Sequence, residues 1–311
     1  MLKIAHHAAF CHPLPEGHRF PMAKYQMLPE QLMAQGLVGP QNFFTPSLSD
    51  FETACLAHDP NYIRHLFDLT LDPKMVRRIG FPLSKELVDR ERYILDGTIQ
   101  AAQYAMQYGV AFNSAGGTHH AGFDFGEGFC LMNDQAVAAA WLLDQGKAER
   151  ILIIDLDVHQ GNGTAHIFEN HPQITTFSMH SLSNFPFVKE RSHLDVGLED
   201  GMGDAEYLSI LEDNLTHLFA TIHPDFVFYQ AGVDILGTDK LGKLNITPLG
   251  CEMRDKMVFA FCHDAQIPVQ VSMGGGYSPQ LHDIVHAHVA TYRAAIAQYH
   301  LQAQRISQNS D

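Results

Sequence analysis

Residues 151–164, ILIIDLDVHQGNGT, join an apolar stretch to two carboxylates, one imidazole and two glycines. At the end of an extended strand, alternate residues point to the same side, so Asp155, Asp157 and His159 can line one face. A carboxylate and a neutral imidazole are good zinc ligands, and Asp234, after a later apolar stretch, can supply a third. Three protein ligands leave one position for water and substrate, as in catalytic zinc sites. Taken alone, the motif is also explained by carboxylates that cap the following helix.

The tandem histidines His119 and His120 form a second candidate element. Because adjacent side chains diverge, each can reach a different point of a bound substrate. One can act as general base on water and then as general acid toward a leaving amine, while the other shapes the local field. Asp155 is placed to orient one imidazole and thereby set its tautomer. A buried histidine pair with a purely structural role is the alternative, but it leaves the preceding Gly116-Gly117 unexplained.

The third element is GGGY at residues 274–277, where the glycines let the backbone turn close to a ligand. The phenol of Tyr277 can donate a hydrogen bond to the oxyanion of a tetrahedral intermediate. A glycine-rich turn with a packing tyrosine is the alternative. Together the three elements predict metal-assisted hydrolysis of an unactivated acyl bond. The chain contains no G-x-S-x-G motif, and Cys130 has no assigned base, so a nucleophilic Ser or Cys is not favoured.

These side chains must be positioned by a regular framework, and short apolar runs alternate with helical patterns along the chain. The pattern predicts strands at 110–114, 150–157, 174–180, 225–232 and 267–276. It predicts helices at 133–146, 163–170, 204–222, 247–265 and 279–304, the first with Asn133 or Asp134 as N-cap. Continuous apolar strands are typical of a parallel sheet covered by helices on both faces. We therefore expect a single-domain α/β protein, residues 1–311, with the unusual residues gathered at the carboxyl ends of its strands.

The amino-acid composition indicates which binding partners and which cellular compartment to expect. The 311 residues carry 35 Asp and Glu against 20 Lys and Arg, a formal charge of −15. This charge disfavours direct nucleic-acid binding and would attract lysine-rich proteins or polyamines, although it can also serve only solubility. Five cysteines without CxxC spacing predict no disulfide framework, which suits a reducing, cytoplasmic setting. No run of about 18 apolar residues occurs, so no membrane span is expected.

Six motifs occur in the order found in the histone deacetylase superfamily: SAGGTHHA, GEGFCLMND, DLDVHQGNGT, FSMH, YQAGVD and MGGGY. The resemblance extends roughly from Ile4 to the last predicted helix and is closest to class IV-like and bacterial histone deacetylase-like amidohydrolases. It implies the arginase/deacetylase fold and a zinc-dependent deacylase with one zinc ion per chain. It further implies an N-acyl-lysine or a related acylated amine as substrate.

The resemblance also assigns roles to individual residues. It implies that Asp157, His159 and Asp234 bind zinc. The implied catalytic residues are the general base and acid His120, its electrostatic neighbour His119, the carboxylate Asp155 behind the pair, and Tyr277. A narrow acyl-lysine channel would be lined by Gly128, Phe129 and Leu241. A structural potassium ion would be held by Asp155 and Ser178, together with the carbonyls of Asp157, His159 and Met179.

Two positions depart from the class I pattern. Asn162 replaces an aspartate behind the second histidine, and a neutral amide makes that imidazole less basic. Where class I members carry an acidic rim residue that grips the substrate backbone, this chain offers Gly80 or Phe81, which suits a small or long-chain acyl substrate instead.

Three other functions remain open at this point: an acetylpolyamine or other small-molecule amidohydrolase, a two-manganese ureohydrolase of the arginase type, and a non-catalytic acyl-lysine binding module. The sequence does not predict an oligomeric state.

Overall fold

The computed structural model describes residues 1–301, which contain one parallel sheet of eight strands. The strands are β1 (Lys3–Ala5), β2 (Phe43–Phe44), β3 (Val110–Asn113), β4 (Ile151–Asp155), β5 (Ile174–Ser181), β6 (Leu194–Leu198), β7 (Phe226–Gln230) and β8 (Val269–Ser272). Their order is β2-β1-β3-β8-β7-β4-β5-β6. Each neighbouring pair is parallel, which confirms the predicted α/β class.

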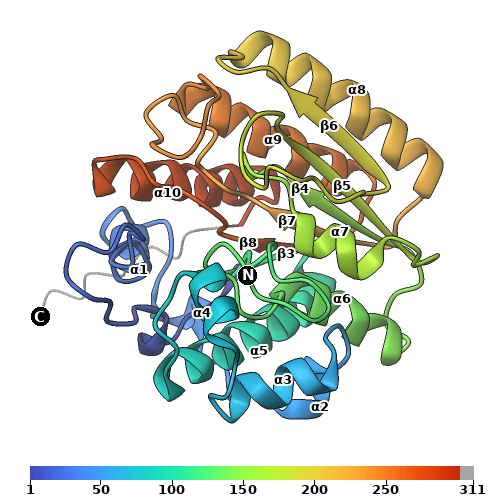
Figure 1. Ribbon diagram of the computed structural model, residues 1–311. Helices are drawn as coiled ribbons and strands as arrows, with labels where there is room; N and C mark the ends of the chain where they lie inside the picture. Colours follow the sequence, from blue (N-terminus) through green and yellow to red (C-terminus); the bar gives the residue numbers. More distant parts are fainter. Residues whose placement is uncertain (302–311) are drawn as a thin grey trace, which may run out of the picture.

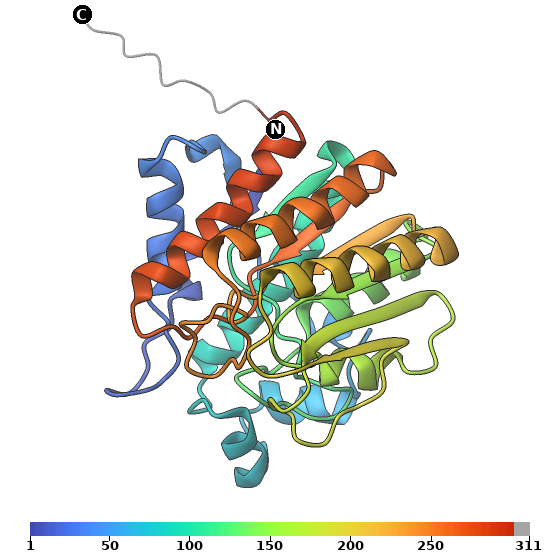
Figure 2. The ribbon, with the colours of Figure 1, turned by 90° about the horizontal axis from the view of Figure 1, so that it is seen from above.

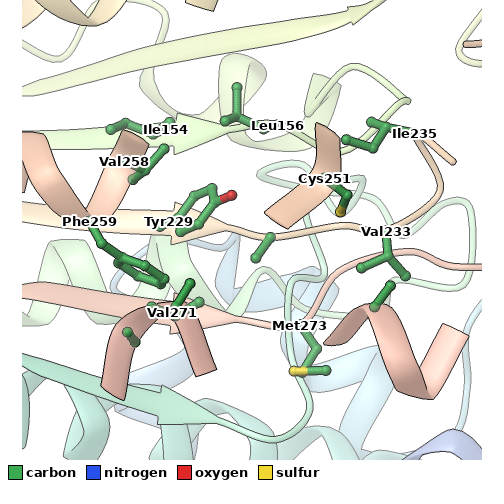
Figure 3. Close-up of a cluster of buried hydrophobic side chains, with 14 of the residues drawn as sticks. Ile154, Leu156, Tyr229, Val233, Ile235, Cys251, Val258, Phe259, Val271 and Met273 are labelled. Atoms are coloured by element: carbon green, nitrogen blue, oxygen red, sulfur yellow. The ribbon is translucent and has the colours of Figure 1, made fainter. Parts of the chain in front are cut away.

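Alternate residues of the strands feed two separate hydrophobic cores on opposite faces of the sheet. Leu152 and Ile154 belong to the core beneath α8 (Asp204–Ile222), α9 (Pro248–Asp264) and α10 (Leu281–Gln298). Figure 3 shows part of this core, and Figure 2 shows the three helices side by side above the sheet. Ile151 and Ile153 face the other core, beneath α5 (Lys85–Tyr108) and α6 (Asp134–Asp144). The sheet is thus covered on both faces (Figure 1).

None of the remaining described helices is longer than α6. Helix α1 (Lys24–Ala34) packs against α10, while α2 (Phe51–Ala54) and α3 (Pro60–Phe67) lie near α5 and α6. Helix α4 (Pro73–Ile79) precedes α5, and α7 (Asn162–Phe168) follows the loop after β4. Two 3-10 turns span Ala8–Phe10 and Pro40–Asn42. None of the described helices has both the length and the apolarity that crossing a bilayer requires.

All five predicted strands are present, with small changes at their ends. The strand predicted at 150–157 ends at Asp155, because the backbone N–H of Asp157 turns to donate to the Asp155 carboxylate. The last predicted helix, 279–304, spans only Leu281–Gln298, and residues 302–304 lie outside the described residues.

The sequence pattern did not predict β1, β2, β6 or the 24-residue helix α5. Helix α5 has clear end signals: Ser84 accepts a hydrogen bond from the Leu87 N–H, and Gly109 follows the last turn with a φ of +87°. Its buried face, however, includes Arg90, Glu91 and other residues that are not apolar, so the usual helical spacing of apolar side chains is weak.

Candidate active site

The loops that follow β3, β4, β7 and β8 converge at one edge of the sheet. These four strands are direct neighbours, in the order β3-β8-β7-β4, so their carboxyl ends lie together. The loops carry His119 and His120, Asp157 and His159, Asp234, and Tyr277, respectively. Residues separated by more than 150 positions in the sequence therefore meet at one point.

Asp157, His159 and Asp234 form a buried cluster whose potential ligand atoms all lie within 4.8 Å of one another. The Nδ1 atom of His159 is 3.1 Å from Oδ1 of Asp157 and 3.2 Å from Oδ2 of Asp234. The other oxygens are fixed by backbone donors: Gly275 N donates to Oδ2 of Asp157 at 2.8 Å, and Val158 N donates to Oδ1 of Asp234 at 3.0 Å. Oδ2 of Asp234 is buried and accepts no backbone hydrogen bond within the described chain, so its polar neighbour there is Nδ1 of His159.

The electrostatics of this cluster fit a bound cation. Burial, reinforced by the charge of Asp157, raises the pKa of Asp234 to about 7. Burial would lower the pKa of His159, but hydrogen bonds and charge from Asp157 and Asp234 outweigh it and raise that pKa to about 10. The cluster therefore attracts positive charge strongly. Two buried carboxylates and one imidazole are a donor set that suits a divalent cation such as zinc.

The two tandem histidines have different partners. His119 Nδ1 lies 2.7 Å from Asp155 Oδ2, and His120 Nδ1 lies 2.6 Å from Asn162 Oδ1, as the sequence analysis expected. Burial would lower the pKa of His119, but Asp155 and Asp157 overcome it and raise that pKa to about 9. Burial and the neighbouring His119 lower the pKa of His120 well below its usual value. His120 is thus a neutral imidazole, able to accept a proton, beside a cationic His119.

Tyr277 is fixed by its backbone and faces the same space. Its N–H donates to Oδ2 of Asp239 at 2.6 Å, and the other oxygen of Asp239 accepts from the N–H groups of Leu241 and Gly242. Asp239 therefore ties the tyrosine loop to the loop after β7. The ring centroids of Tyr277 and His159 are 6.5 Å apart, so the phenol stands next to the metal-ligand cluster.

The loss of side-chain bulk after His159 has a steric cause. A Cβ on Gly161 would overlap the Asp155 carboxylate, and one on Gly163 would overlap the backbone of Ala121, just after the tandem histidines. In the same way, a Cβ on Gly275 would overlap the carboxylates of Asp157 and Asp234. These glycines allow the loops to approach closely enough for their polar groups to meet.

Asp134 is a functional residue that the sequence analysis interpreted too simply. Asn133, not Asp134, caps α6, because its Oδ1 accepts from the Ala136 N–H at 3.0 Å. Asp134 instead holds the histidine loop. Its Oδ1 accepts from Gly117 N, Thr118 N and the Thr118 hydroxyl, each at 2.8 Å. Its Oδ2 accepts from the hydroxyls of Thr98 and Ser272 at 2.7 and 3.0 Å.

Asp134→Ala is expected to lower the free energy of unfolding by at least about 3 kcal/mol. It leaves the buried N–H of Thr118 and the partly buried N–H of Gly117 without partners, at a cost of about 1–3 kcal/mol for a buried group, in addition to the hydroxyls. Urea unfolding followed by circular dichroism measures this change. Asp144→Ala, at the C-terminal end of the same helix, is the matched control and should change stability by less than about 0.5 kcal/mol. Equal stability of the two variants would contradict this role for Asp134.

Two cavities lie beside these residues, and both have His120, His159 and Tyr277 in their linings. A small inner cavity of about 40 Å³ lies among Tyr25, Arg90, His119 and His120. An outer cavity of about 500 Å³ has His120, His159 and Tyr277 in its lining. The predicted channel residues Gly128, Phe129 and Leu241 line the outer cavity, together with residues that the sequence did not suggest, such as Phe185 and Arg19.

The remaining predicted positions are also located. Of the residues predicted to hold potassium, Asp155 on β4 and Ser178 on β5 pair in register, and Met179 follows Ser178 in β5. Asp157 and His159 lie in the loop after β4. The Ser178 hydroxyl lies 3.0 Å from Nδ1 of His180. At the predicted rim position, Phe81 is buried and packs against Phe129, with ring centroids 5.2 Å apart. This segment therefore contributes an aromatic support behind Phe129, which lines the outer cavity.

Comparison with known proteins supports this architecture. The histone deacetylase domain family matches residues 18–292. A protein of Picosynechococcus is 45% identical over 292 residues, covering 94% of this chain and 97% of that protein. Histone deacetylase 2 of Arabidopsis thaliana is 29% identical over 269 residues, covering 84% of this chain and 70% of the relative.

Solved structures show the same fold. The crystal structure of a histone deacetylase homologue complexed with SAHA superposes with a TM-score of 0.83 at 24% identity, covering 97% of this chain and 84% of that one. The crystal structure of the HDA15 HD domain gives a TM-score of 0.78 at 20% identity, with 95% and 88% coverage. With the family match over most of its length, the chain belongs to the histone deacetylase family of hydrolases.

Proposed function

We propose that this protein is a zinc-dependent deacylase that hydrolyses the amide of an N-acyl-lysine or a related acylated amine. The observation that carries the proposal is the buried cluster of Asp157, His159 and Asp234, adjacent to a neutral imidazole and a phenol. We further propose that residues 1–311 act as one catalytic domain. The structural potassium site would be formed by Asp155 and Ser178 with the carbonyls of Asp157, His159 and Met179.

Asp157, His159 and Asp234 would hold the zinc ion, which when bound polarises the amide carbonyl and lowers the pKa of water. His120 accepts the proton that the attacking water loses, because its environment keeps the imidazole neutral. Asn162 accepts a hydrogen bond from the Nδ1–H of His120, which leaves Nε2 as the proton acceptor. The same imidazole then returns the proton to the departing amine.

Neighbouring groups stabilise the charges that develop during this proton transfer. His119, paired with Asp155, contributes a positive charge next to the reacting centre. Tyr277 donates a hydrogen bond to the oxyanion that forms on the acyl carbon. Burial raises the pKa of the Tyr277 phenol well above its usual value, so it keeps the proton that this role requires.

Hydrolysis of an acyl-lysine series from acetyl and trifluoroacetyl to myristoyl, by zinc-loaded protein, tests the proposal directly. Activity on at least one member, blocked by a hydroxamate, is the expected result. No turnover of any acyl-lysine or acetylpolyamine by fully zinc-loaded protein would refute it.

Tyr277→Phe is expected to reduce kcat by about 100–1,000-fold, the usual effect of losing one oxyanion donor. Zinc content and hydroxamate affinity should stay near those of the unchanged protein, because the phenyl ring remains in place. Steady-state kinetics, metal analysis and calorimetry measure the three quantities. If the protein were a non-catalytic binding module, turnover would be negligible with either tyrosine or phenylalanine at this position.

A further inference from the structure

The outer cavity has a charge opposite to that of the whole protein. Its charged lining side chains are Arg19, Arg78, Lys240 and Lys243, and no Asp or Glu is found among the described residues that line it. The chain as a whole has 35 acidic residues against 20 basic ones. These four cations produce a positive electrostatic potential in one cavity of a protein that is strongly acidic as a whole. A ligand that enters the cavity meets this positive potential.

The four cationic side chains differ in how far they are already paired within the protein. The Nε of Arg78 donates to Oε2 of Glu127 at 2.6 Å, so Arg78 is already paired. The Nζ of Lys243 donates to the Ser183 hydroxyl at 2.8 Å and lies 3.7 Å from Oδ2 of Asp200. These two side chains are largely compensated by residues of the protein.

Arg19 and Lys240 are exposed and have no ion-pair partner within residues 1–301. The guanidinium of Arg19 lies over the ring of Phe129, 4.9 Å from its centroid, and Phe129 is a wall of the same cavity. This stacking orients the guanidinium at the entrance while leaving its hydrogen-bond donors free. Lys240 is adjacent to Leu241, which lines the cavity as well, and it enters from the loop after β7.

The residues proposed to perform the reaction, His120, His159 and Tyr277, line the same cavity. The two histidines are buried whereas Arg19 and Lys240 are exposed, so the reacting groups form the floor and the two cations lie toward the solvent. A substrate whose acyl group reaches this floor must place the rest of its amine portion beside the entrance. Free cations there favour a negative charge on that portion and repel a positive one.

We propose that Arg19 and Lys240 form a carboxylate-binding entrance, so that the preferred substrate is an acylated amine that carries a carboxylate on its amine portion. This inference rests on the proposed deacylase function and narrows its substrate class. The carboxylate can be the free α-carboxylate of an acyl-lysine or an acidic residue next to an acyl-lysine in a peptide. A cationic acetylpolyamine is disfavoured by the same charges.

The test compares matched substrates with zinc-loaded protein. One pair is Nε-trifluoroacetyl-lysine, blocked at its α-amine, with either a free α-carboxylate or a carboxamide. A second pair is a short peptide in which trifluoroacetyl-lysine is flanked by Glu or by Gln, and N1-acetylspermidine is the cationic comparison. We expect kcat/KM to favour the anionic member of at least one pair by about tenfold or more, the scale of one charge-assisted hydrogen bond. The preference should shrink as salt is raised.

Variants of Arg19 and Lys240 then test whether these two side chains cause the preference for anionic substrates. Arg19→Gln combined with Lys240→Gln should bring the ratio of kcat/KM between anionic and neutral members close to one. Arg19→Lys should retain part of the preference, because the charge stays while the planar guanidinium is lost. Lys147→Gln, which removes an exposed lysine at a distant surface, is the matched control and should leave the ratio unchanged. Calorimetry of the same pairs with Tyr277→Phe measures the affinity difference while turnover is slowed by about 100–1,000-fold.

The outcomes separate the two proposals. Equal kcat/KM for anionic and neutral members, or a preference for N1-acetylspermidine, overturns the carboxylate-binding entrance while the deacylase function stands. A preference that survives in the double Gln variant overturns the assignment to Arg19 and Lys240. No hydrolysis of any substrate by zinc-loaded protein overturns the deacylase function and this inference together.

Discussion

Asp234→Asn is expected to bind less than about a tenth as much zinc as the unchanged protein and to show no measurable hydrolysis, because ligand loss removes the ion that activates water. The amide keeps the size of the carboxylate, and its oxygen can still accept from the Val158 N–H, so the fold should persist. Metal analysis after dialysis, together with steady-state kinetics, measures both effects. Asp157→Asn should behave in the same way.

The control for this prediction is Asp264→Asn, which removes an equal charge from an exposed side chain at the end of α9. It should retain full zinc content and activity. Unchanged zinc content in both Asp157→Asn and Asp234→Asn would show that the ion is bound by other residues.

The second large effect is expected for His120→Ala. Loss of a general base and acid typically reduces turnover by about 100–10,000-fold, and we expect kcat to fall within this range. Zinc content should remain near one ion per chain, because His120 is not among the three clustered ligands. Loss of zinc together with activity would show that the proposed division between ligand and base is wrong.

Asn162→Asp is the companion variant for His120. A carboxylate in place of the amide would raise the pKa of the His120 imidazole, since an adjacent negative charge favours the protonated form. The acidic limb of the kcat/KM profile against pH should therefore move to higher pH, whereas the Asp264→Asn control should leave the profile in place. An unchanged profile in Asn162→Asp would indicate that His120 does not titrate in the reaction.

Local sequence determined the chemistry of this protein to a considerable extent. The apolar runs that end in Asp155, Asp157 and Asp234 predicted both the parallel sheet and the edge at which polar groups meet, because burial on both faces makes such strands continuously apolar. The tandem histidines and the tyrosine after three glycines were placed at the same edge for the same reason. Six motifs in family order then assigned roles that periodicity alone left open.

Other features depended on packing between distant segments. Helix α5 was not predicted, because the buried charges of Arg90 and Glu91 interrupt its apolar pattern. The burial of Arg90 depends on a distant segment, since its Nε donates to the carbonyl oxygen of Phe10 at 2.9 Å. Asp134 resembled a helix cap, since nothing near it in sequence indicates that it holds a loop sixteen positions away. The role of Asp239 likewise depends on a contact between distant segments, because its carboxylate accepts a hydrogen bond from the N–H of Tyr277.

The charge at the cavity entrance also depends on the tertiary structure rather than on the sequence alone. Net charge is a sum over the sequence, and that sum predicts a preference for cationic partners. Arg19 and Lys240 come from segments more than 200 positions apart, and only the tertiary structure brings both into the lining of the cavity that holds the residues proposed to be catalytic. The sequence by itself therefore determined which reaction the side chains can perform. The tertiary structure decided which charges a substrate meets, because Coulomb interactions depend on distance in space and not on separation along the chain.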